Sequence, residues 1–229
     1  MNNNQLCCGL MLLAAFSGNS QAFDMALGVK GGTLGLGAEA TFKLHEKINL
    51  RAALNTYTET DTFTEDGINY NGEMKLGTYG LTADWHPFSG SFRLSAGIMS
   101  NGNEFNLVAD CKQACDIDGS QYTSDPVNPG QVTAVIDFKS MSPYAGIGWG
   151  NAMSGGKWYV GADVGVLFQG TPQAALTASG VFRNQLNIPV SSSNPVFQAQ
   201  LQNEETTLQE EMNSYDMYPV LNLSLGYRF

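Results

Sequence analysis

The sequence predicts an all-β fold: an eight-stranded antiparallel transmembrane β-barrel with short periplasmic turns, long extracellular loops and one short amphipathic helix. Three observations predict it. Stretches of about ten residues alternate apolar with small polar side chains, as expected when one face meets lipid and the other faces a barrel interior. The links between these stretches are alternately short and long. Beyond the N-terminus no apolar run reaches the roughly 18 residues of a transmembrane helix.

The composition agrees with this fold class and excludes one class of partner. The chain has 229 residues, of which 14% are charged and 26 are glycine, and its net charge is −10. A low charged fraction fits a membrane barrel, and it also fits a soluble lipocalin-like barrel, which would be recovered from the periplasm without detergent. The acidity argues against nucleic acid as a partner, because phosphate binding needs basic patches.

Residues 1–22 are predicted to be a secretory signal peptide. An apolar core from Leu6 to Phe16 precedes Ser20-Gln21-Ala22, which offers small residues at both positions that a signal peptidase reads. Cleavage after Ala22 would remove Cys7 and Cys8 and leave 23–229 as a single domain. Export of such an acidic, glycine-rich chain places it in the periplasm, in the outer membrane or outside the cell, and the predicted barrel favours the outer membrane of a Gram-negative envelope.

The strands can be assigned in order along the chain. The first runs from Phe23 to Lys30, and Gly31-Gly32 can form a two-residue turn into Thr33–Leu44. The alternative is one long strand with a glycine kink, which would give seven strands rather than the preferred, even number of eight. Three hairpins and a closing strand follow: LGLGAEATFKL–HEK–INLRAALNTYT, YGLTADW–HPFSGS–FRLSAGIM, PYAGIGWG–NAMSGGK–WYVGADVGVLF and the C-terminal LNLSLGYRF.

The longer links are expected to be extracellular loops. They are DTFTEDGINYNGE, a polar run over about 103–131, and a segment over about 195–213 that reads as a helix. In that segment Asn194 can cap and Pro195 fits the first helical position. Phe197, Leu201 and two later apolar residues share one face. The helix is expected to pack on the barrel rim, with a lid or gate as the alternative.

Alternation assigns the strand residues to two faces. Apolar residues from Leu34 to Phe42, and their counterparts in the other strands, are expected to face lipid. The aromatic residues next to the short turns and the C-terminus predict a girdle at the periplasmic boundary: Trp85, Trp149, Trp158, Tyr227 and Phe229.

The opposite face carries nearly every charge within the strands. The acids are Asp24, Glu39, Asp84 and Asp163, and the bases are Lys30, Lys43, Arg51, Arg93 and Arg228. Asp84 is expected opposite Arg93 across HPFSGS, and Glu39 diagonal to Arg51 across HEK. Buried charges must be paired or solvated. The sequence therefore predicts a polar network in the lumen, either a packed core that plugs the barrel or a narrow polar path: Glu39, Arg51, Asp84, Arg93, Asp163 and Arg228.

The long links are strongly acidic. They hold sixteen of the 21 acidic residues, including Glu204, Glu205, Glu210 and Glu211 of the predicted helix. An acidic mouth attracts cations over about one Debye length, roughly 8 Å at physiological salt, although solubility alone would also explain it. In the motif CKQAC, Cys111 and Cys115 predict a short-range disulfide in an oxidising compartment.

Nothing in the sequence predicts an enzyme. The only histidines, His45 and His86, lie in short turns, where we expect them to be exposed and far from the acidic loops. The two mature cysteines lack a nearby histidine, and no phosphate loop or metal cluster occurs, so neither a metal nor a cofactor is expected.

With the strands placed, the chain resembles small outer-membrane barrels of the CarO type and, more distantly, OmpW-like proteins. The likeness is carried by KGGTLGLGAEATFKL, LTADWHPFSGSFRLSAG, SPYAGIGWGNA, and VGVLFQGTPQAALTA followed by the acidic helix and YPVLNLSLGYRF. The resemblance implies an eight-stranded monomeric barrel in outer-membrane lipid, associated with carbapenem entry and passive uptake of basic amino acids such as ornithine. It also implies that the terminal aromatic residue is read by the barrel-assembly machinery.

Two functional hypotheses follow. The first is passive uptake of small, preferably cationic, solutes through the polar interior. The second is a closed structural or interaction barrel whose extracellular loops contact partners.

Overall fold

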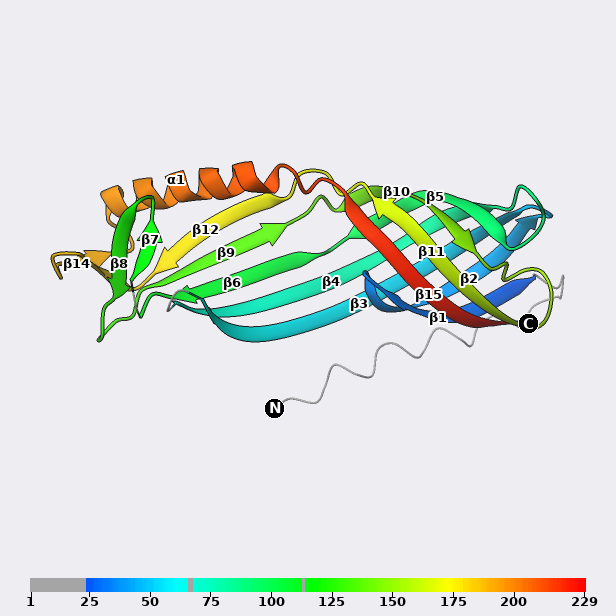
Figure 1. Ribbon diagram of the computed structural model, residues 1–229, viewed down its shortest axis with the longest axis horizontal. Helices are drawn as coiled ribbons and strands as arrows, with labels where there is room; N and C mark the ends of the chain where they lie inside the picture. The colour runs from blue at the N-terminus through cyan, green and yellow to red at the C-terminus, as the bar shows by residue number, and fades with distance from the viewer. Residues whose placement is uncertain (1–23, 66–67, 113) are drawn as a thin grey trace, which may run out of the picture.

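The computed structural model describes residues 24–65, 68–112 and 114–229; the predicted signal peptide and its cleavage site lie outside them. Strands dominate, with one helix beside them (Figure 1). In chain order the elements are β1 Met25–Gly32, β2 Gly35–His45, β3 Ile48–Glu65, β4 Ile68–Trp85, β5 Phe92–Asn101, β6 Glu104–Asp110, β7 Cys115–Ile117, β8 Ser120–Ser124, β9 Gln131–Asp137, β10 Met141–Trp149, β11 Trp158–Leu167, β12 Gln173–Ser179, β13 Val181–Asn184, β14 Pro189–Ser191, α1 Pro195–Met212 and β15 Tyr218–Arg228.

Eight of these strands close into a barrel, which confirms the predicted fold class. The ring runs β5–β4–β3–β2–β1–β15–β11–β10 and returns to β5, with antiparallel pairing throughout. The first strand pairs with the last, from Ala26 opposite Arg228 to Gly32 opposite Asn222. Closure leaves none of these strands with an unpaired edge inside the bilayer. Among the described residues, no helix is both long enough and apolar enough to span a membrane.

The first hairpin settles the strand count at eight, but its turn differs from the prediction. Gly31 and Gly32 still belong to β1, and the turn falls on Thr33 and Leu34. Gly35 then starts β2 with φ +94°, and a Cβ there would lie 2.7 Å from the Thr56 carbonyl oxygen. Glycine is required at this position rather than at the predicted turn.

The barrel wall has the apolar face outside and the polar face inside. In β15, Leu223 is 68% exposed, whereas its neighbours Asn222 and Ser224 are each 5% exposed. This inversion of a soluble protein's pattern is what lipid contact requires, and it fits a transmembrane barrel rather than a lipocalin-like one. Leu34 is an exception to the predicted lipid-facing set, because its place in the turn lets the side chain fold inward, where it is fully buried.

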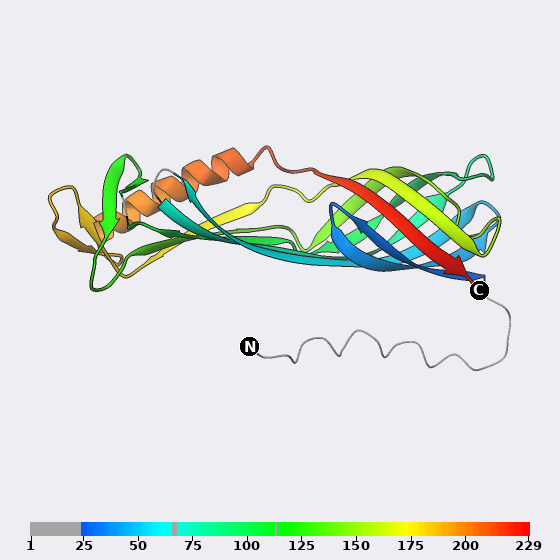
Figure 2. The same cartoon turned by 60° about the horizontal axis from the view of Figure 1, so that its bottom comes forward.

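Beyond the barrel, the predicted long connections lie at one end of the ring, but most of their residues form a sheet rather than irregular loops. β3 and β4, each 18 residues long, continue past the ring as a hairpin, and β6, β9 and β12 add to the free side of β4. The two ends of β4 therefore pair with different strands on the same side: Thr78 lies opposite Asn101 of β5, and Lys75 lies opposite Glu104 of β6. We call the part of this sheet outside the ring the sheet extension; Figure 2 shows it projecting from the barrel.

The helix covers the sheet extension, not the barrel rim. α1 packs along β12 with Phe197 and Leu201 buried, and Asn194 caps it by accepting hydrogen bonds from the backbone N–H groups of Val196 and Phe197 (Figure 1). A small second sheet, ordered β14–β13–β8–β7, lies at the far end of the extension. We call this sheet and the start of α1 the distal subdomain.

Candidate functional site

Six buried charged residues meet in the middle of the barrel. Three acids face three bases, so the formal charge of this layer is zero, and each of the six is at most 6% exposed. Such burial is tolerated only when every charge is paired, because desolvation costs several kcal/mol per ion. The six residues, here called the interior charge network, are Lys30, Glu39, Arg51, Asp84, Arg93 and Asp163.

Arg51 is the hub of the interior charge network. Its guanidinium donates to Asp163 Oδ2 at 2.9 Å and to Asp84 Oδ1 at 3.0 Å, and lies 3.5 Å from Glu39 Oε2. The fork of guanidinium donors suits a residue that must bind several carboxylates at once. Arg51 thereby joins strands β2, β3, β4 and β11 across the interior.

A second cation shares the carboxylate of Asp163. Arg93 donates to Asp163 Oδ1 from Nη2 at 2.8 Å and from Nε at 3.2 Å, and its Nη1 donates to the Gly150 carbonyl oxygen. Gly148 makes room for this pair, since a Cβ there would lie 2.6 Å from Asp163 Oδ1 and 2.8 Å from Arg93 Nε. A larger residue would have to displace the ion pair.

Two neutral groups and one lysine add to the network, although Glu39 Oε2 accepts no hydrogen bond from the described residues. Tyr159 donates its hydroxyl to Glu39 Oε1 at 3.0 Å, and Ser95 donates to Asp84 Oδ1 at 2.6 Å. Lys30 Nζ lies 4.0 Å from Glu39 Oε2. Residues of six strands, β1 to β5 and β11, thus meet in this network.

Apolar side chains seal the interior charge network on both sides. Towards the sheet extension lies a fully packed cluster, and towards the short turns lies a second one that includes residues from the β10–β11 turn. The first contains Leu34, Met99, Tyr144, Leu167 and Val220, and the second contains Ala26, Ala152, Met153 and Tyr159. A cavity beside Arg51 and Asp163 has a volume of about 10 Å³, which is close to the space for one water molecule. A cavity of this size is too small for an amino acid.

Some predicted members of the polar interior lie elsewhere. Asp84 pairs with Arg51 rather than with Arg93, because Asp84 sits opposite Ser95 in the β4–β5 register. The predicted proximity of Glu39 and Arg51 is present. Arg228 lies outside the network: its guanidinium donates to the carbonyl oxygens of Met153 at 2.9 Å and Gly155 at 3.1 Å. It holds the turn that seals the short-turn end.

Two further predicted inward charges also differ. Asp24 precedes β1, and Lys43 lies near the end of β2, and both are exposed. Strand ends reach the barrel mouth, where alternation no longer directs a side chain into a packed interior. Parity is therefore informative in the middle of a strand and not at its ends.

The predicted aromatic girdle lies at the short-turn end. Trp85, Trp149 and Trp158 are about half exposed or more, and Tyr227 packs edge-to-face against both Trp158, at 5.2 Å between ring centroids, and Phe229, at 5.4 Å. Rings at one level on the outer face suit the boundary between lipid and water.

The four predicted acids of α1 divide into two pairs. Glu204 accepts a hydrogen bond from Asp118 N at 3.1 Å, and Glu205 accepts one from Leu176 N at 2.7 Å. These two acids hold the helix against the distal subdomain and β12. Glu210 and Glu211 are exposed and form no ion pair with the described residues, so only this second pair resembles the acidic surface that the sequence predicted.

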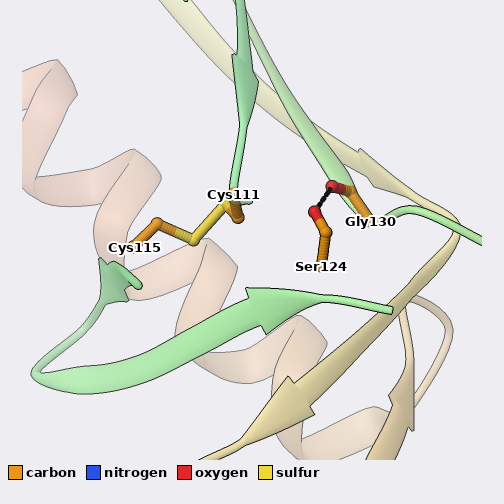
Figure 3. The surroundings of a disulfide bond; sticks show 4 residues. All are labelled: Cys111, Cys115, Ser124 and Gly130. Carbon is orange, nitrogen blue, oxygen red and sulfur yellow. Dashed lines mark hydrogen bonds between the residues drawn. A yellow bond between two sulfur atoms is a disulfide. The ribbon is translucent and has the colours of Figure 1, made fainter. Parts of the chain in front are cut away.

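The distal subdomain has a core of its own. The structure joins Cys111 and Cys115 by a disulfide (Figure 3), and both cysteines pack with the stacked rings of Phe182 and Phe197, whose centroids are 4.6 Å apart. Figure 3 also shows Ser124 donating to the Gly130 carbonyl oxygen. The disulfide therefore belongs to a packed structural unit.

Asp125 organises the same region electrostatically. Backbone N–H groups of Val127 and Asn128 donate to its carboxylate, and Arg183 Nη2 lies 2.7 Å from Asp125 Oδ2. These contacts stabilise the ionised carboxylate and hold the pKa of Asp125 below its usual range, with the backbone hydrogen bonds as the largest causes.

The histidines differ from each other. His45 is exposed, as predicted, whereas His86 is buried at 1% exposure, with Nδ1 3.1 Å from the Gly90 carbonyl oxygen and Nε2 3.2 Å from Asn49 Nδ2. The HPFSGS turn folds over the ring, which alternation cannot reveal. Within the described part of the chain, no group of three or more His, Cys, Asp or Glu residues could hold a metal ion.

These features define a transmembrane β-barrel with a packed polar interior and a large sheet outside the ring. A search of protein-family models and of curated proteins finds no match. Among solved structures, this chain is similar to the crystal structure of Acinetobacter baumannii CarO2, with 17% sequence identity and a TM-score of 0.59. The match covers 92% of this chain and 100% of CarO2. Acinetobacter baumannii CarO is 15% identical with the same coverage and TM-score. At this identity the likeness establishes the fold, and the predicted resemblance to CarO-type barrels is confirmed at that level.

Proposed function

We propose that this chain is a Gram-negative outer-membrane β-barrel with a closed interior, whose function lies in the sheet extension and helix that it presents outside the cell. In this orientation the short turns are periplasmic. The aromatic girdle contacts lipid at the inner boundary, and β15 carries the terminal aromatic residue recognised by the assembly machinery. Because one chain completes the ring, we propose that the protein is a monomer.

One observation carries the proposal: the polar interior is packed between two apolar clusters. A solute path needs a continuous hydrated passage, yet the interior charge network is balanced, buried and internally bonded. The residues outside the ring are instead built into a substantial structure, with a five-stranded sheet, a helix and a disulfide-linked subdomain. An ordered structure of this size outside the membrane favours a role in contact with partners. No catalytic role is proposed.

The second candidate is passive uptake of small cationic solutes such as basic amino acids. The net charge of −10 and the exposed Glu210 and Glu211 favour it, because an acidic surface raises the local concentration of cations. This function requires a second conformation in which the interior charge network opens.

Planar-bilayer conductance distinguishes the two candidates. The purified barrel, with folding verified by heat-modifiable gel migration, is measured beside a variant in which Glu204, Glu205, Glu210 and Glu211 are changed to glutamine. Glutamine keeps a carbonyl oxygen that can still accept the bonds at Glu204 and Glu205. The closed barrel predicts no conductance steps for either protein and no swelling of proteoliposomes in lysine or ornithine. Cation-selective steps that weaken in the variant would overturn it in favour of uptake.

A further inference from the structure

One edge of the sheet extension is open. β3 pairs with β2 only as far as Thr56, opposite Leu36, and then continues to Glu65 with β4 on its other side. Among the described residues, no strand pairs with the β2-facing side of β3 beyond Thr56, and Thr58–Thr64 are all exposed. This stretch, called the β3 edge, forms the lower margin of the extension in Figure 1.

The backbone groups of the β3 edge face outward in a regular order. The carbonyl oxygens of Leu54 and Thr56 lie on the β2 side, since they are nearest to the Cβ positions of Gly37 and Gly35. In an antiparallel strand the groups on one side recur at every second residue, so Thr58, Thr60, Thr62 and Thr64 present their N–H and C=O groups to the open side. At one position the edge is already occupied, because the Thr62 N–H donates to the Asp61 carboxylate at 2.8 Å, and an added strand must displace that side chain there. The row is a template for strand addition.

The opposite edge of the same sheet is blocked. On β12, Glu205 of α1 accepts from Leu176 N at 2.7 Å, and Gln209 accepts from Ala174 N at 3.0 Å while donating to the Pro172 carbonyl oxygen at 2.9 Å. Helix side chains thus occupy the groups that a further strand would use. Proteins manage exposed edges because such edges promote aggregation. Covering one edge and leaving the other open favours a use for the open one.

Charge indicates the kind of strand that fits. Glu59 and Asp61 lie on one face of β3, opposite Met74 and Gly72 of β4, and neither forms an ion pair with a described Lys or Arg. A second copy paired antiparallel about Asp61 would place two aspartates opposite each other, which is destabilising. A strand with Lys or Arg on this face would offset both acids. On the threonine face, β-branched residues would pack well.

We propose that the β3 edge binds an extended basic segment of another protein by strand addition, with Lys or Arg at alternate positions and β-branched residues between them. This inference rests on the proposed contact function and names the class of partner. The backbone of Thr58–Thr64 supplies the hydrogen bonds, and Glu59 and Asp61 supply the preference for a basic strand. Because the pairs are exposed, binding weakens as salt rises.

The test uses a fluorescently labelled eight-residue peptide that alternates lysine and valine, titrated with the folded full-length barrel in detergent and followed by anisotropy. Thr60→Pro removes an outward N–H at an edge position, where proline is tolerated, and is expected to weaken binding at least about tenfold. Glu59→Lys with Asp61→Lys is expected to weaken it by roughly tenfold and to admit the matching glutamate–valine peptide. The matched control, Glu210→Lys with Glu211→Lys, makes the same charge change on α1 and is expected to leave binding unchanged.

Each other outcome overturns the inference. Equal loss in the control would show attraction to net charge, and unchanged binding in both β3 variants would place the peptide elsewhere. Absence of peptide binding would refute the basic partner, and sedimentation of the unliganded protein as a dimer abolished by Thr60→Pro would assign the edge to a second copy. Heat-modifiable migration verifies folding, and the charge variants remain informative if the proline variant fails to fold. Conductance of the wild type reports separately on the closed barrel, so the two proposals fail independently.

Discussion

Replacing Arg51 with glutamine tests how strongly the barrel depends on its interior charge balance. The guanidinium contacts Asp163 at 2.9 Å, Asp84 at 3.0 Å and Glu39 at 3.5 Å, and the side chain is 5% exposed, so solvent screens these interactions little. The substitution leaves three buried carboxylates facing two cations. Breaking a buried pair in this way costs about 3–5 kcal/mol. We expect Arg51→Gln to lower the free energy of unfolding by that amount.

A second variant separates charge imbalance from lost packing. Changing Asp84 to asparagine together with Arg51→Gln restores two acids and two bases, and we expect this double variant to recover roughly half of the loss. Lys75→Gln is the control, because Lys75 pairs with Glu73 at 2.9 Å on an exposed surface, where solvent screens the pair and little change in stability is expected. Urea titrations followed by heat-modifiable migration measure all three. A loss below about 1 kcal/mol for Arg51→Gln, or a double variant less stable than the single, would refute the reasoning.

Three further predictions concern individual parts of the structure. Arg228→Met removes two hydrogen bonds to the β10–β11 turn, so amide exchange over 151–156 should rise up to about tenfold, and unchanged exchange would exclude the sealing role. Opening the disulfide by changing Cys111 and Cys115 to serine should destabilise the distal subdomain by about 2 kcal/mol, visible as faster proteolysis there with unchanged barrel migration; loss of migration would contradict this separation. Because the pKa of Asp125 is lowered by folding, its stabilisation is present above the unfolded value of about 4 and is lost as pH falls through the folded value. Protection of the distal-subdomain amides, taken relative to their intrinsic exchange rates at each pH, should therefore fall on acidification in the wild type and change less in Asp125→Asn, and equal responses would refute the assignment.

The barrel could be predicted because lipid imposes a strict rule on strand sequences. One face must be apolar over the whole crossing, so alternation in stretches such as LNLSLGYRF reveals both the strand and its two faces. The aromatic residues beside the short turns follow from the same rule. The identity of the inward charges therefore followed from parity for most of the interior charge network.

The partners within that network could not be predicted. Strand stagger in a closed barrel decides which side chains meet across the interior, and adjacency within a hairpin says little about it. Arg51 and Asp163 are 112 residues apart in the chain, yet they form the central pair. Asp84 and Arg93, which are near in sequence, are displaced along the strands and bind different partners.

The sheet extension was not predicted because strands outside the membrane do not need an apolar face toward lipid. The stretch DTFTEDGINYNGE carries threonine and asparagine on one face, and Asp61, Gly72 and the stacked rings of Phe63 and Tyr70 on the other, so it lacks a continuous apolar face. Its two strands pair locally as the β3–β4 hairpin, whereas the rest of the sheet extension depends on pairing between distant segments, as between β4 and β6 or β6 and β9. Leu34 and His86 were misplaced for a related reason, since each lies in a turn that folds over the ring.

The most direct test of the closed interior is the water accessibility of Ser224. Its hydroxyl lies inside the barrel with 5% of the residue exposed and no hydrogen-bond partner among the described residues, so Ser224→Cys changes little else. Thr60→Cys on the exposed β3 edge provides the comparison. With a small water-soluble thiol reagent, we expect the cysteine of Ser224→Cys in the folded barrel to react at least about a hundredfold more slowly than that of Thr60→Cys. Labelling inside the barrel requires local opening. Comparable rates at the two positions would contradict the account and indicate a hydrated passage through the barrel.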